Sequence, residues 1–209
     1  VTNSALEKFA DVIDQAQCEV LSITDDVART MSDTVTPQGL IAVCEIPNIS
    51  IANLVPAAKS KFIYISEVQD PGNAGTIIRS ADAFGFDAVI TSPNSVDIFS
   101  PKVVRSTVGS LWHIPVYQNV ALDEILNWDC TFVALDTSAD LPLSKIVLDR
   151  SVVAIFGNEA RGLHNFAALS ASNNRITPVK IPMPGNAESL NLSVAASIVM
   201  YQLANIPTS

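Results

Sequence analysis

Basic residues are scarce in this chain: 12 Lys and Arg stand against 21 Asp and Glu, which gives a net charge of −9. A protein that binds nucleic acid over a broad surface usually has the opposite balance, because its affinity comes from cations that face phosphates. The chain therefore has no global attraction for RNA or DNA. Any such contact must depend on a local cluster of Lys and Arg.

Cysteines are few as well. Cys18, Cys44 and Cys130 are widely separated and none has a CxxC partner, which argues against a disulfide framework and against structural zinc. His113 and His164 are distant in sequence from each other and from the cysteines, so we expect no metal site. Reduced thiols are typical of a cytoplasmic protein, and this is the location that we predict.

Long apolar runs are also missing. Each run is interrupted well before the roughly 18–20 residues that cross a bilayer, and no basic segment precedes an apolar one at the N-terminus. We expect no membrane segment and no export signal. What the 209 residues do have is 48% hydrophobic and 16% charged side chains, with a mean hydropathy of +0.33. This composition predicts one large globular domain, or a medium one with a small appendage.

Residues 1–46 are predicted to form a small α/β unit that begins with apolar residues at helical spacing. The stretches 18–23 and 40–46 resemble strands, and Thr24 is suited to cap a helix between them. Two helices and two strands make a thin core, and the chain starts with Val, so we expect this unit to lack its N-terminal half. Residues 47–60 contain two prolines and no clear periodicity, which predicts a linker.

From residue 61 to 209 the pattern changes to short apolar runs that alternate with helix-length stretches. Such runs are typical of a parallel sheet covered on both faces. The predicted strands are 62–66, 87–91, 113–117, 131–135, 152–156 and 176–181. The last helix is predicted over 189–205. One side of that helix carries Leu190, Val194, Ile198 and Tyr201.

Three loops that follow predicted strands carry the residues best suited to chemistry, since open parallel sheets bind ligands at that edge. In the first, Gly72 and Gly75 are predicted to let the backbone turn, and Gly75 to open a helix. Arg79 would then lie one turn into that helix and lean toward its N-terminus, as in an anion clamp. The alternative is a glycine turn beside a solvated arginine. Neither GxGxxG nor GxxxxGKS/T is present, so the usual dinucleotide and NTPase fingerprints are absent.

The second loop, 156–163, places two glycines around polar and charged side chains that include Asn158 and Glu159. This pattern favours ligand contact over the alternative, a helix start with Glu159 near its positive end. The third loop, 181–197, has two prolines and a glycine before its helix. Ser189 is predicted to be the N-cap of that helix.

In this order, the three loops resemble the motifs of the SpoU (TrmH-like) branch of the SPOUT methyltransferases. The first motif of that family, NxGxxxR, corresponds to Asn73, Gly75 and Arg79. The second motif corresponds to 156–163 and the third to 181–195.

The resemblance covers about residues 60–205, and 100–116 resembles the Lys/Arg-bearing stretch of the family. It implies an α/β fold in which a mostly parallel sheet is flanked by helices and a deep trefoil knot lies at the C-terminal end. It also implies S-adenosylmethionine as cofactor, a homodimer, and an RNA-binding domain like that of a ribosomal protein in 1–46.

The activity implied is methyl transfer to a ribose 2′-hydroxyl of structured RNA, with ribosomal RNA favoured. A tRNA substrate, methylation of a base, and a catalytically silent knotted RNA-binding protein stay open as alternatives. No metal is implied.

The resemblance also implies roles for individual residues. Arg79 would stabilise the alkoxide that develops on the 2′-oxygen, since arginine stays protonated and a general-base role would need an unusual environment. The other catalytic residues implied are Asn73, Glu159, Ser189 and Asn191. The cofactor would contact backbone groups near Gly157, Ile181 and Leu190, with Phe156, Asn158, Pro182 and Met183 beside them. RNA would be held by Lys59, Lys61, Lys102, Arg105 and Arg161.

Overall fold

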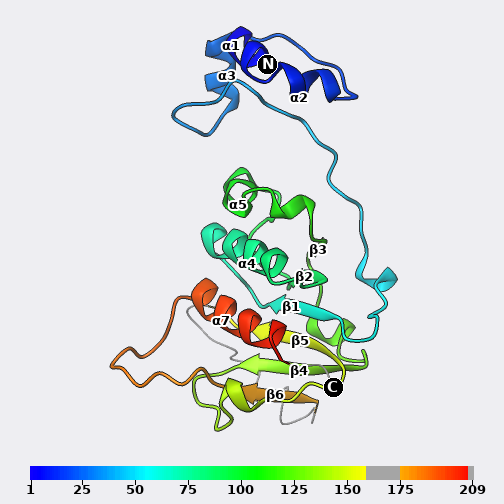
Figure 1. The fold of residues 1–209 in the computed structure, drawn as a ribbon, viewed down its shortest axis with the longest axis vertical. Coiled ribbons are helices and arrows are strands. Elements are labelled where there is room, and N and C mark those ends of the chain that lie inside the picture. The colour runs from blue at the N-terminus through cyan, green and yellow to red at the C-terminus, as the bar shows by residue number, and fades with distance from the viewer. Residues whose placement is uncertain (159–174, 207–209) are drawn as a thin grey trace. The chain divides into compact units, whose positions relative to one another are not determined.

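The computed structural model describes residues 1–158 and 175–206. The chain divides into two compact units, Val1–Pro47 and Asn48–Ser209 (Figure 1). Within the described ranges, no helix is long and apolar enough to span a membrane.

The first unit consists of three short helices: α1 (Asn3–Lys8), α2 (Ala10–Gln15) and α3 (Asp25–Met31). The cap predicted for α3 is confirmed, because Val27 N donates a hydrogen bond to Thr24 Oγ1 at 3.3 Å. Only small side chains close the core of this unit, chiefly Ala5 and Ala28.

No strand forms in the first unit, so the strands predicted over 18–23 and 40–46 are wrong. A strand needs a neighbour with which it shares several backbone hydrogen bonds. In the first stretch, the Val1 ammonium donates to the Leu21 carbonyl and Ile23 N donates to the Val1 carbonyl. For 40–46, no described residue provides a backbone partner. The apolar content of both stretches is therefore not enough to make a sheet.

The second unit is built on a six-stranded sheet in which all neighbouring strands are parallel, in the order β3-β2-β1-β5-β4-β6. The strands are β1 (Lys61–Ile65), β2 (Ala88–Thr91), β3 (Val116–Tyr117), β4 (Cys130–Leu135), β5 (Ser151–Phe156) and β6 (Ile176–Val179). Each predicted strand is present. The strand predicted over 113–117 is shortened to β3, because the amides of His113 and Ile114 both donate to the Ser110 carbonyl and close a turn.

The sheet has an apolar cluster on each face. Helices α4 (Pro71–Ala83) and α7 (Leu192–Ala204) cover one face, where they bury residues such as Ile77 and Met200. Among the described residues, the other face is covered by the 3-10 turns η1 (Ile51–Asn53) and η3 (Leu122–Glu124) and by Trp128. The Trp128 ring lies 5.2 Å from that of Phe62, centroid to centroid. Cys130 is buried in this second cluster, and burial raises the pKa of its thiol to about 11.

Helix α4 begins four residues earlier than predicted, so Gly75 does not open it. Asp70 Oδ1 accepts a hydrogen bond from Asn73 N at 2.8 Å, and Pro71 occupies the first turn. The pair Asp-Pro is a strong helix-start signal, since Asp caps the helix and Pro has no amide hydrogen to leave unpaired. Gly72 and Gly75 both lie inside the helix, and neither has a positive φ.

The role of Gly75 is the close packing of α4 against α5 (Pro101–Thr107). A Cβ at residue 75 would lie 1.8 Å from Ser106 Oγ and 2.9 Å from the Ser106 carbonyl carbon. Any larger residue would therefore push the backbone of α5 away. At Gly72 the nearest atom to an added Cβ is Asp70 Oδ1, the end of a flexible side chain, at 2.9 Å.

We predict that Gly75→Ala destabilises the protein although alanine favours a helix. Overpacking against α5 is expected to lower the free energy of unfolding by about 1–3 kcal/mol. At roughly 2–4 °C for each kcal/mol in a chain of this size, thermal denaturation measures the change as a lower Tm. Gly72→Ala is the matched control and should lower Tm by less, because only the flexible side chain of Asp70 has to shift. Equal Tm values for the two variants would contradict the close-packing role of Gly75.

Candidate functional site

The carboxyl ends of β1 and β5 meet at one edge of the sheet, where hydrogen bonds link the chain segments that follow them. Ser66 N donates to the Phe156 carbonyl at 2.9 Å, and Asn158 Nδ2 donates to the Glu67 carbonyl at 2.8 Å. Glu67 has a positive φ of 50°, and its amide donates to Ser92 Oγ at 2.7 Å. The start of the second motif is therefore tied to the loop that leads into the first. Central strand ends are where open parallel sheets bind ligands.

The third motif reaches the same region through Asn191. Its side-chain oxygen caps α7 by accepting hydrogen bonds from Ser193 N at 2.9 Å and Val194 N at 3.3 Å. Its side-chain nitrogen donates to Asn73 Oδ1 at 3.1 Å. One amide thus begins α7 and connects it to the first turn of α4.

The N-cap predicted at Ser189 is wrong, because Asn191 holds that position. Ser189 is exposed and precedes the N-cap Asn191 by two residues. Both Ser and Asn are good caps, so the residue type could not decide between them. Within the described part of the chain, Asn191 and not Ser189 also has a hydrogen-bond partner on α4, Asn73, which favours the cap at 191.

Arg79 lies in the third turn of α4, farther from the N-terminus than predicted, because the helix begins at Pro71. Its side chain is exposed, and among the described residues none forms an ion pair or hydrogen bond with its guanidinium. With about 100° per residue, Arg79 projects between the flank that carries Gly75 and the flank that carries Ser80. Gly75 faces α5, and Ser80 Oγ lies 2.8 Å from Ser197 Oγ on α7. The arginine is therefore presented on the open stripe of α4 between α5 and α7.

The residues suggested for the cofactor differ in exposure. Phe156 is buried in the core, whereas Gly157, Asn158, Ile181 and Met183 are partly buried, and Pro182 and Leu190 are exposed. From Ile181 to Leu190, no backbone hydrogen bond to another described backbone group is present. This stretch therefore has amides and carbonyls at the sheet edge that secondary structure does not use.

The cations suggested for RNA binding fall into two places. Lys102 and Arg105 are exposed on α5, the helix against which Gly75 packs. Lys59 and Lys61 lie at the amino end of β1, which is the edge of the sheet opposite the motif loops. Of these four described cations, Lys102 and Arg105 lie on a helix that packs against α4, the helix of Arg79. Glu159, Arg161 and His164 lie outside the described residues.

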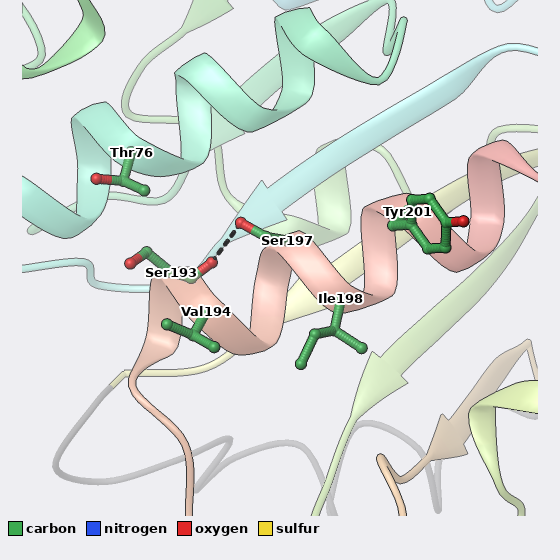
Figure 2. Close-up of a pocket in the computed structure, with 6 residues that line it drawn as sticks. All are labelled: Thr76, Ser193, Val194, Ser197, Ile198 and Tyr201. Atoms are coloured by element: carbon green, nitrogen blue, oxygen red, sulfur yellow. Dashed lines mark hydrogen bonds between the residues drawn. The ribbon is translucent and has the colours of Figure 1, made fainter.

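An apolar surface lies beside the site on α7 (Figure 2). Val194, Ile198 and Tyr201 are 48%, 39% and 59% exposed, so the side of the predicted helix that carries them faces away from the core. The buried side of α7 consists of Ser193, Ala195, Ala196, Val199, Met200 and Leu203. With Thr76 of α4, the exposed side lines a shallow pocket of about 360 Å³.

Two features of the site were not predicted, although the sequence contains a recognisable pattern for one of them. The Asp70-Pro71 pair predicts the true start of α4 once it is read as a cap followed by the first helical residue. The hydrogen bond between Asn158 and Glu67 has no such signal in the sequence, because the two residues are 91 positions apart. Among described residues, no group of three or more His, Cys, Asp or Glu is placed to hold a metal ion.

The chain is similar to a family profile and to several known proteins. The SpoU rRNA Methylase family profile matches residues 60–201. The chain is 37% identical over 190 residues to the 23S rRNA (guanosine(2553)-2'-O)-methyltransferase RlmP of Bacillus subtilis, covering 90% of this chain and 72% of the relative. It is 27% identical to the 23S rRNA (uridine(2479)-2'-O)-methyltransferase of Streptomyces viridochromogenes, covering 94% of this chain and 71% of the relative.

Two solved structures with AdoMet are similar over most of this chain. The AdoMet-bound rRNA methyltransferase from Sinorhizobium meliloti has a TM-score of 0.83 and 28% identity, over 97% of this chain and 77% of that one. The SpoU methyltransferase AviRb from Streptomyces viridochromogenes, in complex with AdoMet, has a TM-score of 0.83 and 26% identity, over 93% and 76%. Together with the family profile and the joined motif loops, these similarities show that the chain belongs to the SpoU rRNA methylase family.

Proposed function

We propose that this protein transfers a methyl group from S-adenosylmethionine to a ribose 2′-hydroxyl of ribosomal RNA. The observation that carries the proposal is the hydrogen bond between Asn191 and Asn73, which joins the third motif to the helix that presents Arg79. The two rRNA 2′-O-methyltransferases to which the chain is similar support the choice of substrate.

The sheet edge is suited to hold S-adenosylmethionine. An adenine ring needs apolar surface on its faces and backbone groups at its edge, which is the usual composition of a small-molecule site. Ile181 and Met183 are partly buried, and Gly157 has no side chain to block a ligand. The backbone groups from Ile181 to Leu190 are not used by other described backbone groups. When bound, the cofactor supplies an electrophilic methyl group attached to a positively charged sulfur.

Arg79 would act on the RNA rather than on the cofactor. A ribose hydroxyl is a poor nucleophile near neutral pH, so the site must favour negative charge on the oxygen as its proton leaves. The guanidinium presents five donors and stays charged, which suits it to a developing alkoxide and to the adjacent phosphate. Asn73 would contact the same substrate group, and Asn191 would act as a positioning residue that orients the Asn73 amide.

A second copy of this chain is the partner that we propose for the exposed side of α7. Branched and aromatic side chains gather there, and the pocket that they line with Thr76 is mostly apolar (Figure 2). A contiguous apolar surface on a helix marks an interaction site. Because Thr76 and Arg79 are three residues apart on α4, a second copy on this surface would lie beside the catalytic arginine.

The rest of the protein fits this proposal. Residues 1–46 would be the RNA-binding domain, 47–60 the linker, and 61–209 the methyltransferase domain. The trefoil knot would be formed by the second and third motif segments, part of which lies outside the described residues. Ribosomal RNA as substrate favours a cytoplasmic protein, where the exposed thiols of Cys18 and Cys44 stay reduced.

The proposed activity is tested with unmodified 23S rRNA and S-adenosylmethionine that carries a radioactive methyl group. Label should enter the RNA and survive alkaline hydrolysis as a dinucleotide, because a methylated 2′-oxygen cannot attack the neighbouring phosphate. Arg79→Ala should reduce the rate at least about 100-fold, as expected when a donor to a developing oxyanion is removed. Its affinity for S-adenosylmethionine should change by less than about threefold, well under 1 kcal/mol.

Other outcomes would revise this assignment. Label in tRNA and not in 23S rRNA would change the substrate. Label recovered in mononucleotides after alkaline hydrolysis would indicate a methylated base, because the free 2′-hydroxyl then allows cleavage. Undiminished transfer by Arg79→Ala would contradict the role of the arginine. A folded protein that binds no S-adenosylmethionine in calorimetry would be a silent RNA-binding protein.

Two substitutions at Asn191 are predicted to separate its capping and positioning roles. Asn191→Asp keeps an oxygen for the α7 cap but loses the donor to Asn73, so Tm should stay unchanged while methyl transfer falls by about tenfold or more. Asn191→Ala loses both functions and should also lower stability by about 1 kcal/mol. Thermal denaturation and kcat measure the two roles. Full activity in Asn191→Asp would show that the contact with Asn73 has no part in catalysis.

The proposed dimer is tested by Ile198→Asp, measured by sedimentation equilibrium. A carboxylate buried without a partner costs several kcal/mol, so the dissociation constant should rise by about 100-fold or more. Val147→Asp is the matched control, since Val147 is 81% exposed in a loop outside the pocket. It should leave the mass unchanged. A wild-type monomer, or equal effects of the two substitutions, would contradict the assignment of this surface.

A further inference from the structure

Trp112 is exposed, in contrast to the other tryptophan of the chain. Trp128 packs against Phe62, whereas the Trp112 side chain is 55% exposed and has no ring partner among the described residues. A large aromatic ring is costly to leave in water, and exposed aromatic rings are typical of binding surfaces. The exposed indole ring is therefore suited to bind a ligand with an apolar face.

The turn that carries Trp112 is held firmly by its neighbours. Two consecutive left-handed residues follow α5, Val108 with φ 52° and Gly109 with φ 95°. This backbone is unfavourable for a β-branched residue, and Val108 gains no burial in return because it is 69% exposed. Leu111 and Ile114, which precede and follow Trp112 in the sequence, are buried. The strained turn directs the apolar side chains of Val108 and Trp112 outward while its ends are fixed in the core.

A contact to α4 places this turn on the Arg79 side of the site. His113 Nδ1 lies 3.0 Å from Asp82 Oδ2, and Asp82 follows Arg79 by one helical turn. Hydrogen bonds from Ser110 and His113 lower the pKa of Asp82, so its carboxylate is ionised and already partnered. The turn η2 (Ser110–Trp112) thus lies along the same flank of α4 as α5 does.

The segment that carries Trp112 is basic although the chain as a whole is acidic. From Ile98 to Leu122 the sequence has no Asp or Glu, while the whole chain has 21. The same stretch carries Lys102 and Arg105, both exposed on α5. An exposed aromatic ring that follows a helix with exposed cations has the composition of a surface that stacks nucleobases and holds their phosphates.

We propose that Trp112 stacks on an unpaired base of the RNA substrate, close to the nucleotide whose ribose Arg79 contacts. The inference rests on the proposed function for its substrate. Trp112 would select single-stranded or flipped-out nucleotides over paired ones, because the face of an unpaired base is accessible to the indole. Lys102 and Arg105 hold the adjacent phosphates.

Binding is tested with a single-stranded oligouridylate and with an RNA duplex of the same length, both labelled with a fluorophore. Trp112→Ala should weaken binding of the oligouridylate by about tenfold, and Trp112→Phe, which keeps an aromatic face, by less than about threefold. Duplex binding should change by less than about twofold for both, because paired bases present no face to the indole. Val147→Ala, an exposed apolar residue in a loop, is the matched control and should change neither.

Several results would overturn the inference. They are equal loss of single strand and duplex by Trp112→Ala, wild-type affinity for the oligouridylate in that variant, and no binding by the wild type. Dissociation of the dimer by Trp112→Ala would also overturn it, because the ring would then lie between two copies of the chain.

Methyl transfer to 23S rRNA distinguishes this inference from the proposed function. Trp112→Ala should raise KM for the RNA by about tenfold and leave kcat and cofactor affinity unchanged. If the wild type transfers no methyl group but Trp112→Ala still loses the oligouridylate selectively, the proposed function fails and the stacking role stands. If the wild type methylates the RNA and Trp112→Ala has an unchanged KM, only the stacking role fails.

Discussion

The position of helix α4 is the constraint on which the site depends. Ile77 and Ile78 fix the helix to the sheet, and Gly75 allows α5 to approach one flank. On the other flank, Ser80 and Asn73 each make a hydrogen-bonding contact with α7. Three sides of α4 are thus occupied, and among the described residues the stripe that carries Arg79 stays open. An arginine on such a fixed helix loses little backbone entropy on meeting its substrate.

Asn191 links the beginning of α7 to the beginning of α4. Its oxygen is committed to the amides of α7 and its nitrogen to Asn73, so the amide has one orientation. A shift of either helix would break one of these bonds. The geometry at the start of α4 therefore depends on a residue 118 positions away in the sequence.

Local charge reconciles an acidic chain with an RNA substrate. Electrostatic attraction falls off within about 8 Å at physiological salt, so distant acids weaken a small cationic surface only slightly. The packing of α5 on α4 places the exposed Lys102 and Arg105 on the helix next to the one that carries Arg79. Lys59 and Lys61 are as basic but lie at the other end of β1.

The sequence was enough to predict the order of strands along the chain. It was also enough to predict the helix of Ile77 and Ile78 and the three motif loops. Apolar periodicity is a local property, and short buried runs between helices have few other interpretations. The predictions that were wrong concern elements whose formation depends on contacts with residues distant in the sequence. Residues 18–23 and 40–46 have the composition of strands but no strand to pair with. Asn191, and not Ser189, is the N-cap of α7, and it also donates a hydrogen bond to Asn73 on α4.

The sequence by itself therefore determined the fold class, the family motifs and the residue types of the site. Tertiary structure alone decided that Gly75 serves helix packing, that the apolar side of α7 with Val194 and Ile198 faces outward, and that Trp112 lies on the flank of Arg79. The physical reason is the same in each case. Spacing along a helix shows which residues share a side, but only the packing of other elements decides which side is buried.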